Sequence, residues 1–234
     1  MTRRSPDIQS TLRRATVIAS LFACLPSTVQ ADEPEFRSGR EVGLVAGPTL
    51  STIHYQGPGT YDLRGRSGIT AGFRTRGPVH PYIDLRLDIR YLPRGFSEVL
   101  LDPLTGEPTG ATVRSGFHYL HAPLVASTEL GLGEDGELGN VFVQAGLSAS
   151  VLLARTTSDP DQPGAFQDLF AFDHFDLGAT VGAGATLTLG HSYAATLELR
   201  YNRTLLNHIT SSDEDFAVFS DFTVLFGIHY DLPF

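Results

Sequence analysis

The chain has 234 residues, of which 41% are hydrophobic, so we expect one folded domain or at most two. All 17 basic residues are Arg, and the absence of Lys excludes a lysine Schiff base, a Ser–Lys dyad and a P-loop lysine. The formal charge is −9, and residues 1–31, with four Arg and one Asp, leave −12 for the remainder, which argues against a nucleic-acid partner.

The first 31 residues have the pattern of a secretory signal peptide. Four arginines between positions 3 and 14 precede an apolar segment, Ala15–Leu25. Small residues follow at Val29 and Ala31, so we expect cleavage before Asp32. The single cysteine, Cys24, would be removed with this peptide, which excludes an internal disulfide and a cysteine metal site. No later apolar run approaches the ~20 residues that a membrane helix needs.

After residue 41, apolar and polar residues alternate with a period of two, which predicts extended strands with one apolar face. In residues 42–53 the apolar set is Val42, Leu44 and Ala46. In residues 68–76 it is Ile69, Ala71 and Phe73, opposite Thr70, Gly72, Arg74 and Arg76. In residues 82–92 it is Ile83, Leu85, Leu87, Ile89 and Tyr91, opposite Tyr82, Asp84, Arg86, Asp88 and Arg90.

The same alternation continues in the middle of the chain. Residues 112–128 place Leu120, Ala122, Leu124 and Ala126 on the apolar face, with Tyr119 and His121 opposite. Residues 141–153 alternate Val141, Val143, Ala145, Leu147, Ala149, Val151 and Leu153 with Gln144, Gly146, Ser148 and Ser150. In residues 175–189 the odd positions from Phe175 to Leu189 are apolar, and the even positions are Asp, Gly or Thr.

Two further segments complete the set. Residues 193–201 present Tyr193, Ala195, Leu197, Leu199 and Tyr201 against Thr196, Glu198, Arg200 and Asn202. Residues 222–234 present Phe222, Val224, Phe226, Ile228, Tyr230, Leu232 and Phe234 against Asp221, Thr223, Gly227, His229 and Asp231. An alternating aromatic strand that ends in Phe resembles the signal read by the barrel-assembly machinery of bacterial outer membranes, carried here by Tyr230, Leu232 and Phe234.

These segments predict an all-β fold, an eight-stranded antiparallel transmembrane β-barrel, preceded by the signal peptide. Long polar connections near residues 55–66, 96–111, 156–169 and 204–215 alternate with short turns near 77–80 and 190–192 and a longer turn near 131–139. This alternation is typical of single-chain barrels with both termini in the periplasm. We therefore expect residues 1–31 to be removed, 32–40 to form a short periplasmic segment, and 41–234 to form one barrel domain in the bacterial outer membrane.

The lumen of an eight-stranded barrel is just wide enough for side chains to fill. The alternation sends many charged side chains inward, and buried charges without partners would cost several kcal/mol each. We therefore expect an interlocked network of arginines and carboxylates, for which the inward glycines make room. Its members are Arg74, Arg76, Asp84, Arg86, Asp88, Arg90, Asp176, Glu198, Arg200 and Asp221. The alternative is a narrow, ion-lined pore for small solutes.

A barrel enzyme is a third possibility from a different class. Ser115, His118, His121 and Glu129 lie on one predicted strand, but no spacing brings them into hydrogen-bond contact. We expect His121 and His229 to belong to the interior, with no catalytic residues, no cofactor and no metal site. The acidic stretch 211–215 could supply oxygen ligands to Ca²⁺, but it lacks a complete loop motif and is interpreted as a solvated loop.

Several segments resemble the PorT-type outer-membrane β-barrel family (outer membrane protein beta-barrel domain). Val42–Ser51 is similar to its Gly-rich first strand, and Phe117–Val125 to its Tyr-Leu-x-x-Pro-Leu strand, with His121 in place of the usual acidic residue. Asp176, Gly178, Gly182 and Gly184 match its Asp-x-Gly-x₃-Gly-x-Gly strand, and residues 200–207 a later segment. The resemblance covers roughly residues 41–234 and implies an eight-stranded outer-membrane barrel without catalytic residues.

The sequence thus predicts a non-enzymatic integral outer-membrane protein with a packed, charged interior. Its extracellular loops would serve a structural, binding or secretion-accessory role. The expected partners are outer-membrane lipid, periplasmic chaperones and the barrel-assembly machinery during insertion, and an unidentified extracellular or periplasmic protein.

Overall fold

The computed structural model describes residues 40–56, 62–101, 105, 107–132, 138–158, 174–190, 192–206 and 216–232. The predicted signal peptide, the cleavage site and the terminal Phe234 lie outside this set, as do His191 and the acidic stretch 211–215. Among the described residues, no helix is long and apolar enough to cross a membrane.

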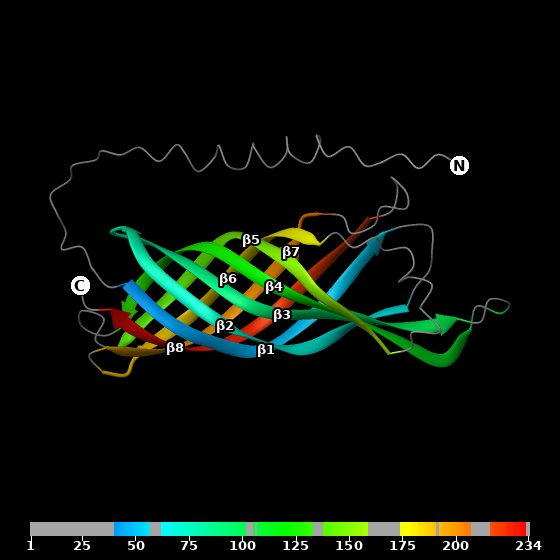
Figure 1. Ribbon diagram of the computed structural model, residues 1–234. Coiled ribbons are helices and arrows are strands. Elements are labelled where there is room, and N and C mark those ends of the chain that lie inside the picture. Colours follow the sequence, from blue (N-terminus) through cyan, green and yellow to red (C-terminus); the bar gives the residue numbers. More distant parts are fainter. Residues whose placement is uncertain are drawn as a thin grey trace, which may run out of the picture. The chain divides into compact units, whose positions relative to one another are not determined.

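The described residues form eight strands that pair in chain order and close into a barrel (Figure 1). The strands are β1 (Arg40–Gln56), β2 (Asp62–His80), β3 (Ile83–Leu101), β4 (Pro108–Leu132), β5 (Gly139–Thr157), β6 (Phe175–Thr188), β7 (Tyr193–Thr204) and β8 (Phe216–Leu232). Closure is made by β1 and β8, which run antiparallel with Leu44 opposite Ile228. Every pairing in the ring is antiparallel, so the predicted fold class is confirmed.

The alternation in the sequence becomes two faces of the barrel wall. On the outer face Ile69 and Phe73 are 72% and 68% exposed, and Phe226 is 57% exposed. Inward residues on the same strands, such as Arg74 of β2, are buried. The barrel is therefore the inverse of a soluble protein, with its apolar side chains outside and its charges inside, as a lipid-embedded barrel requires.

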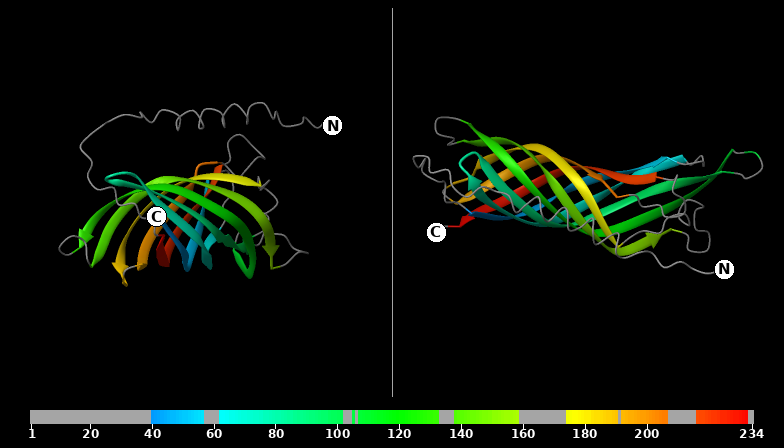
Figure 2. Two further views of the ribbon diagram at one scale, coloured as in Figure 1. Left: turned by 60° about the vertical axis from the view of Figure 1, so that its left-hand side comes forward. Right: turned by 90° about the horizontal axis from the view of Figure 1, so that it is seen from above.

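The strands cross the barrel at a tilt and differ in length (Figure 2). Both described ends of the chain, Arg40 and Leu232, are paired at one end of the barrel, here called the turn end. The turn end also holds the connections 81–82, 133–138 and 189–192. The opposite end, the loop end, holds the connections 57–61, 102–107, 158–174 and 205–215.

The structure corrects the predicted connections at both ends. Most of the stretches 55–66 and 96–111, predicted as loops, are strand, and β4 alone has 25 residues. A barrel strand needs only about 9–11 residues to cross a membrane. The β3–β4 hairpin accordingly reaches beyond the other strands at the loop end (Figures 1 and 2). Tyr82, predicted to face inward, lies in the turn 81–82 and is exposed.

The lumen near the loop end is filled by an apolar cluster that the alternation did not predict. Its residues come from β3, β4, β5 and β8 and are at most 8% exposed: Leu92, Phe96, Phe117, Tyr119, Leu152, Ala217 and Phe219. The Phe117 ring contacts both neighbouring rings, with its centroid 6.0 Å from that of Phe96 and 5.8 Å from that of Phe219. This cluster, the apolar cap, closes the loop end of the lumen above the charged residues.

Candidate functional site

Four charged side chains from three strands form a ring across the middle of the lumen. Arg74 of β2 binds Asp88 of β3 through Nε at 2.7 Å, and binds Glu198 of β7 through Nη2 at 2.8 Å. Arg200 of β7 binds the same two carboxylates, with its Nη1 2.8 Å from Asp88 Oδ2. Two arginines thus share two carboxylates, and all four side chains are at most 3% exposed. This central ring ties β2 and β3 to the opposite wall.

A second bridge, made by Arg94 of β3, lies next to the apolar cap. Its Nη1 is 2.7 Å from Asp176 Oδ2 on β6, and its Nε donates to Asp221 Oδ2 on β8 at 2.8 Å. The guanidinium carbon also lies 4.9 Å from the ring centroid of Tyr119 and 5.8 Å from that of Phe219. Arg94 therefore joins three strands and connects the charged part of the lumen to the apolar part.

A third group of charges lies toward the turn end. Arg76 of β2 binds Glu41 at 3.0 Å, Asp84 at 2.6 Å and Glu129 at 2.6 Å. Glu129 also binds Arg86, whose guanidinium carbon lies 3.8 Å from the centroid of the Phe142 ring. The three groups together occupy the lumen from the turn end to the apolar cap.

The structure places all ten predicted interior residues in the lumen and brings nine of them into short ion pairs. The exception is Arg90 of β3, which is buried but lies 3.8 Å from Asp88 at its nearest salt-bridge contact. Within the described chain, its Nε and Nη1 have no hydrogen-bond partner. Arg90 thus adds a positive charge beside the central ring whose ion pair with Asp88 is long, at 3.8 Å.

Three residues of this network were not predicted: Arg94, Glu41 and Glu129. Arg94 continues the even-numbered parity of Asp84, Arg86, Asp88 and Arg90, so extending the strand would have found it. The apolar residues at positions 92 and 96 share that parity and hid it. Of the predicted assembly signal, Tyr230 pairs its ring with Tyr193 at 5.2 Å, Leu232 ends β8, and Phe234 lies outside the described residues.

Inward Gly72 makes room for an arginine directly, because a Cβ there would lie 2.9 Å from Arg90 Cγ, whereas the inward glycines of β6 make room for residues of β5. A Cβ on Gly182 would lie 2.9 Å from Gln144 Nε2, and one on Gly184 2.6 Å from the Phe142 ring. Phe142 in turn supports Arg86. The glycines of β6 therefore act on the charged network through one intermediate layer of side chains.

Among the described histidines, His121 and His229 face the lumen and His118 faces outward. His121 is buried and its Nδ1 lies 2.9 Å from Ser150 Oγ, while His118 contacts the Tyr91 hydroxyl on the outer face. His229 is buried near the turn end. Within the described strands, no group of three or more His, Cys, Asp or Glu side chains is arranged to hold a metal ion.

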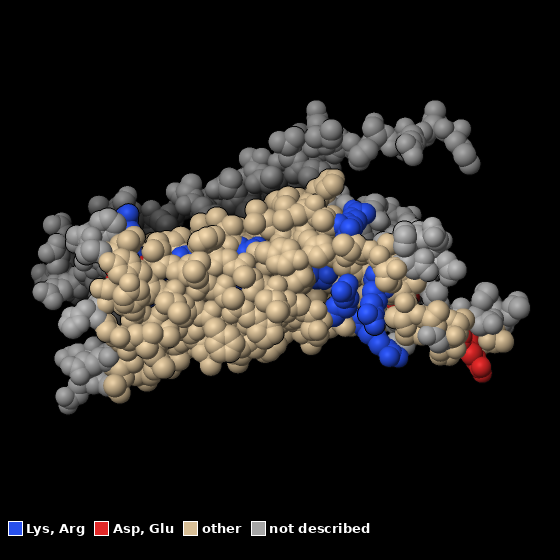
Figure 3. Space-filling view, turned by 60° about the horizontal axis from the view of Figure 1, so that its bottom comes forward, with Lys and Arg blue, Asp and Glu red and all other residues tan. Residues whose placement is uncertain are grey.

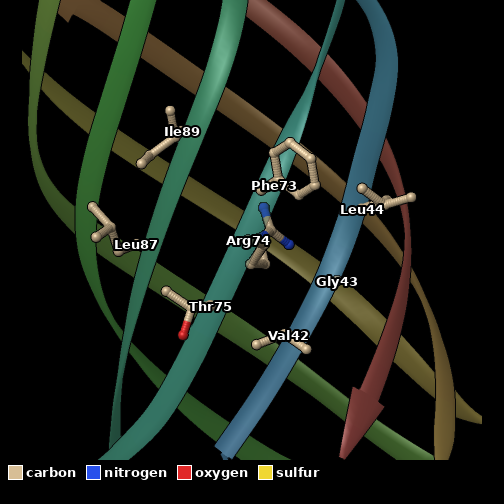
Figure 4. Close-up of a pocket in the computed structure, with 8 residues that line it drawn as sticks. All are labelled: Val42, Gly43, Leu44, Phe73, Arg74, Thr75, Leu87 and Ile89. Atoms are coloured by element: carbon tan, nitrogen blue, oxygen red, sulfur yellow. The ribbon is translucent and has the colours of Figure 1, made fainter.

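The outer wall carries an apolar groove of about 470 Å³ across β1, β2 and β3. Its walls are two rows of paired residues, Leu44–Phe73–Ile89 and Val42–Thr75–Leu87 (Figure 4). Gly43 of β1 lies between Val42 and Leu44, which belong to different rows. The side chain of Arg74 lies on the lumen side of the wall. Because the groove opens on the apolar outer face, it suits a lipid acyl chain rather than a polar solute.

Comparison with known protein families supports the barrel architecture. A family model described as "Outer membrane protein beta-barrel domain" matches residues 30–210. The chain belongs to this family. It is an integral β-barrel protein of the bacterial outer membrane. None of the curated proteins matches this outer-membrane barrel.

Solved structures of small outer-membrane barrels resemble it at low identity. OprG of Pseudomonas aeruginosa gives a TM-score of 0.52 at 10% identity, covering 84% of this chain and 97% of OprG. Ail, the attachment invasion locus protein of Yersinia pestis, gives 0.41 at 11% identity over 83% and 99% of the two chains. Neisserial surface protein A gives 0.44 at 11% identity over 81% and 96%. The likeness to OprG supports the fold alone.

Proposed function

We propose that this outer-membrane barrel is a closed, non-enzymatic scaffold that holds its loop-end strands outside the membrane for a structural or binding role. The observation that carries the proposal is the set of ion pairs crossing the lumen. Arg74 and Arg200 link opposite walls through shared carboxylates, and Arg94 links β3 to β6 and β8. An ion moving through the lumen would have to separate these pairs.

The narrow pore is the second candidate, and the layering of the lumen argues against it. A permeating solute would meet the apolar cap as well as the charges, and Phe96, Phe117 and Phe219 are fully buried there. A water-filled channel would leave at least part of such side chains accessible. The lumen therefore supports a plugged core, as expected for a barrel of this strand number.

A barrel enzyme receives less support from the same geometry. The one Ser–His pair found among the described lumen residues, Ser150 with His121, is at most 2% exposed, so a lipid or peptide could not reach it. His118 contacts the hydroxyls of Tyr91 and Thr156 through its two ring nitrogens and faces outward. Activity on lipid or peptide substrates that is lost in His121→Ala or His118→Ala would restore the enzyme hypothesis.

The binding role is supported by the length of the loop-end strands. The β3–β4 hairpin continues well past the residues needed to cross the membrane, and it stays hydrogen-bonded out to Val99 and Thr112. Such a hairpin offers a rigid surface to an extracellular partner. The PorT-type assignment, and with it a secretion-accessory role, is part of this proposal and is supported by Asp176, Gly178, Gly182 and Gly184.

The test is conductance of the purified protein in a planar lipid bilayer. We expect no stable channel from the native protein, because the central ring and the apolar cap both block the lumen. Stable current steps whose ion selectivity changes in Arg200→Gln but not in Arg203→Gln would overturn the proposal. The two variants remove the same charge, but Arg200 lies inside the lumen and Arg203 is exposed on the wall.

A further inference from the structure

A group of arginines gathers on the outer wall at the loop end, where the rest of that face shows almost no charge (Figure 3). Arg64 of β2 and Arg114 of β4 are both exposed, and both lie directly opposite Ser97 of β3. Ser97 faces outward because its neighbours Phe96 and Glu98 are buried inward. The two arginines therefore share one face, two strands or about 10 Å apart.

A third arginine is held beside them by two glycines. Arg66 of β2 extends over β3, and its Nη1 donates to the Ser115 carbonyl of β4 at 3.4 Å. Gly95 and Gly116 are paired under it, and a Cβ there would lie 3.2 Å from Arg66 Cδ and 3.0 Å from Arg66 Nη1. Because the two glycines have no side chains, the Arg66 side chain can lie directly against the strands at this point. Arg64, Arg66 and Arg114 are the outer arginine cluster.

The height of the cluster on the wall is set by β3. The outward residues of β3 are apolar from Ile83 to Tyr91, nine residues that match the ~9–11 needed to cross the hydrocarbon. Gly95 follows four residues later, or about 9 Å further along the membrane normal for a strand tilted by ~45°. Arg66 therefore lies at the level of the lipid headgroups, and Arg64 and Arg114 lie slightly beyond it.

The charge of the surroundings favours an anionic ligand at this level. In the part of the chain that the structure describes, the exposed acidic side chains are Glu107, beyond the cluster near the hairpin tip, and Asp231, at the turn end. The buried and half-buried acidic side chains lie inside the lumen or near its turn end. Three arginines of an acidic protein therefore lie together on the outer wall at the level of the lipid headgroups.

We propose that the outer arginine cluster binds the phosphate groups of a phosphorylated glycolipid in the outer leaflet of the outer membrane. Guanidinium groups bind phosphate in a bidentate manner and tolerate partial burial, which suits a site that is half in the headgroup layer. Three of them on one face can hold two phosphates of a single disaccharide headgroup. The inference rests on the placement of the barrel in the membrane and does not depend on whether the barrel conducts.

The test is a titration of the full mature protein in neutral detergent with a diphosphorylated glucosamine disaccharide lipid. Each arginine near a charged lipid surface strengthens binding by about fivefold. The variant R64Q/R66Q/R114Q should therefore bind the lipid about 100-fold more weakly than the native protein. The control R40Q/R155Q/R203Q removes three other exposed arginines and should bind within a fewfold of the native protein. A heat-dependent shift in gel mobility shows that each variant is folded.

Two further titrations identify the ligand. The same lipid without its phosphates should bind far more weakly to the native protein, and inorganic phosphate at equal concentration should not compete. Equal losses in both triple variants, unchanged binding in R64Q/R66Q/R114Q, or competition by inorganic phosphate would overturn the proposal. Stronger binding of a soluble sulfated polysaccharide at the same cluster would also overturn it, in favour of an extracellular polyanion.

Discussion

In the lumen, the effect of removing a charged residue on the free energy of unfolding depends on whether its partners keep another ion pair. Burial makes an unpaired charge costly by several kcal/mol, whereas replacing a charge that lacks a direct partner removes that cost. Arg74 and Arg90 provide the contrast. Both are buried, but Arg74 binds Asp88 and Glu198 at short distance, and Arg90 only approaches Asp88 at 3.8 Å.

We expect Arg74→Met to lower the free energy of unfolding by about 3–5 kcal/mol, because it removes one of the two arginines that pair with the buried carboxylates Asp88 and Glu198. Arg90→Met should change it by less than about 1 kcal/mol or raise it, because two arginines and two carboxylates would remain in the central ring. Urea unfolding of the barrel in lipid vesicles, followed by gel mobility, measures both. Equal destabilisation by the two substitutions would show that Arg90 is paired as tightly as Arg74.

At this scale the sequence predicted the lumen well where its alternation is unbroken. The ten predicted charges lie inside because parity alone decides which way a strand residue points. Arg94 escaped prediction because Leu92 and Phe96 share its face, and an apolar residue inside a barrel looks like one that faces lipid. Tyr82 was misplaced because a turn interrupts the parity that its neighbours follow.

At the scale of the strands, the alternation predicted all eight strands but not where they end at the loop end of the barrel. Inside the membrane, an outward residue must be apolar, so the alternation of apolar and polar residues is clear in the sequence. Beyond Tyr91 on β3 the outer face meets headgroups and solvent, so outward positions such as Gly95 and Ser97 become small or polar. Hydrogen bonding between strands continues there, but it leaves no pattern in the sequence, and the extended β3–β4 hairpin was interpreted as a loop.

This separation between the membrane part and the extension predicts that the hairpin can be shortened. Replacing residues 100–111 with Asn-Gly would place a two-residue turn between Val99 and Thr112, which are partners in the β3–β4 pairing. We expect the free energy of unfolding to change by less than about 2 kcal/mol, because the apolar cap and all three charged groups lie outside the removed segment. Binding of any extracellular partner should be lost.

A matched deletion inside the membrane provides the control. Leu87 and Leu124 are partners on β3 and β4, and removing both shortens the same hairpin by one pair. The deletion reverses the parity of every residue beyond it and would send apolar side chains into the lumen and charges into lipid. We expect this variant not to fold in lipid vesicles. If it folds as well as the parent, the apolar band on these strands does not fix their register.

At the scale of the whole molecule, an even number of antiparallel strands brings both described ends of the chain to the turn end. The connections 81–82, 133–138 and 189–192 lie at the same end, and the two longest connections, 158–174 and 205–215, lie opposite with the hairpin and the outer arginine cluster. A chain that inserts from the periplasm can leave its ends and tight turns on that side. The loop end would then face outward, as the lipid site and the binding role both require.

Cysteine labelling in intact cells tests this orientation with a matched pair. The sequence has a single cysteine, Cys24, within the predicted signal peptide, so the parent protein serves as the unlabelled reference. Thr105 and Tyr82 are both exposed and lie at opposite ends of the barrel. We expect a membrane-impermeant maleimide to label Thr105→Cys in intact cells, and Tyr82→Cys only after the outer membrane is permeabilised. The reverse pattern would place the arginine cluster on the periplasmic side, where an outer-leaflet glycolipid could not reach it.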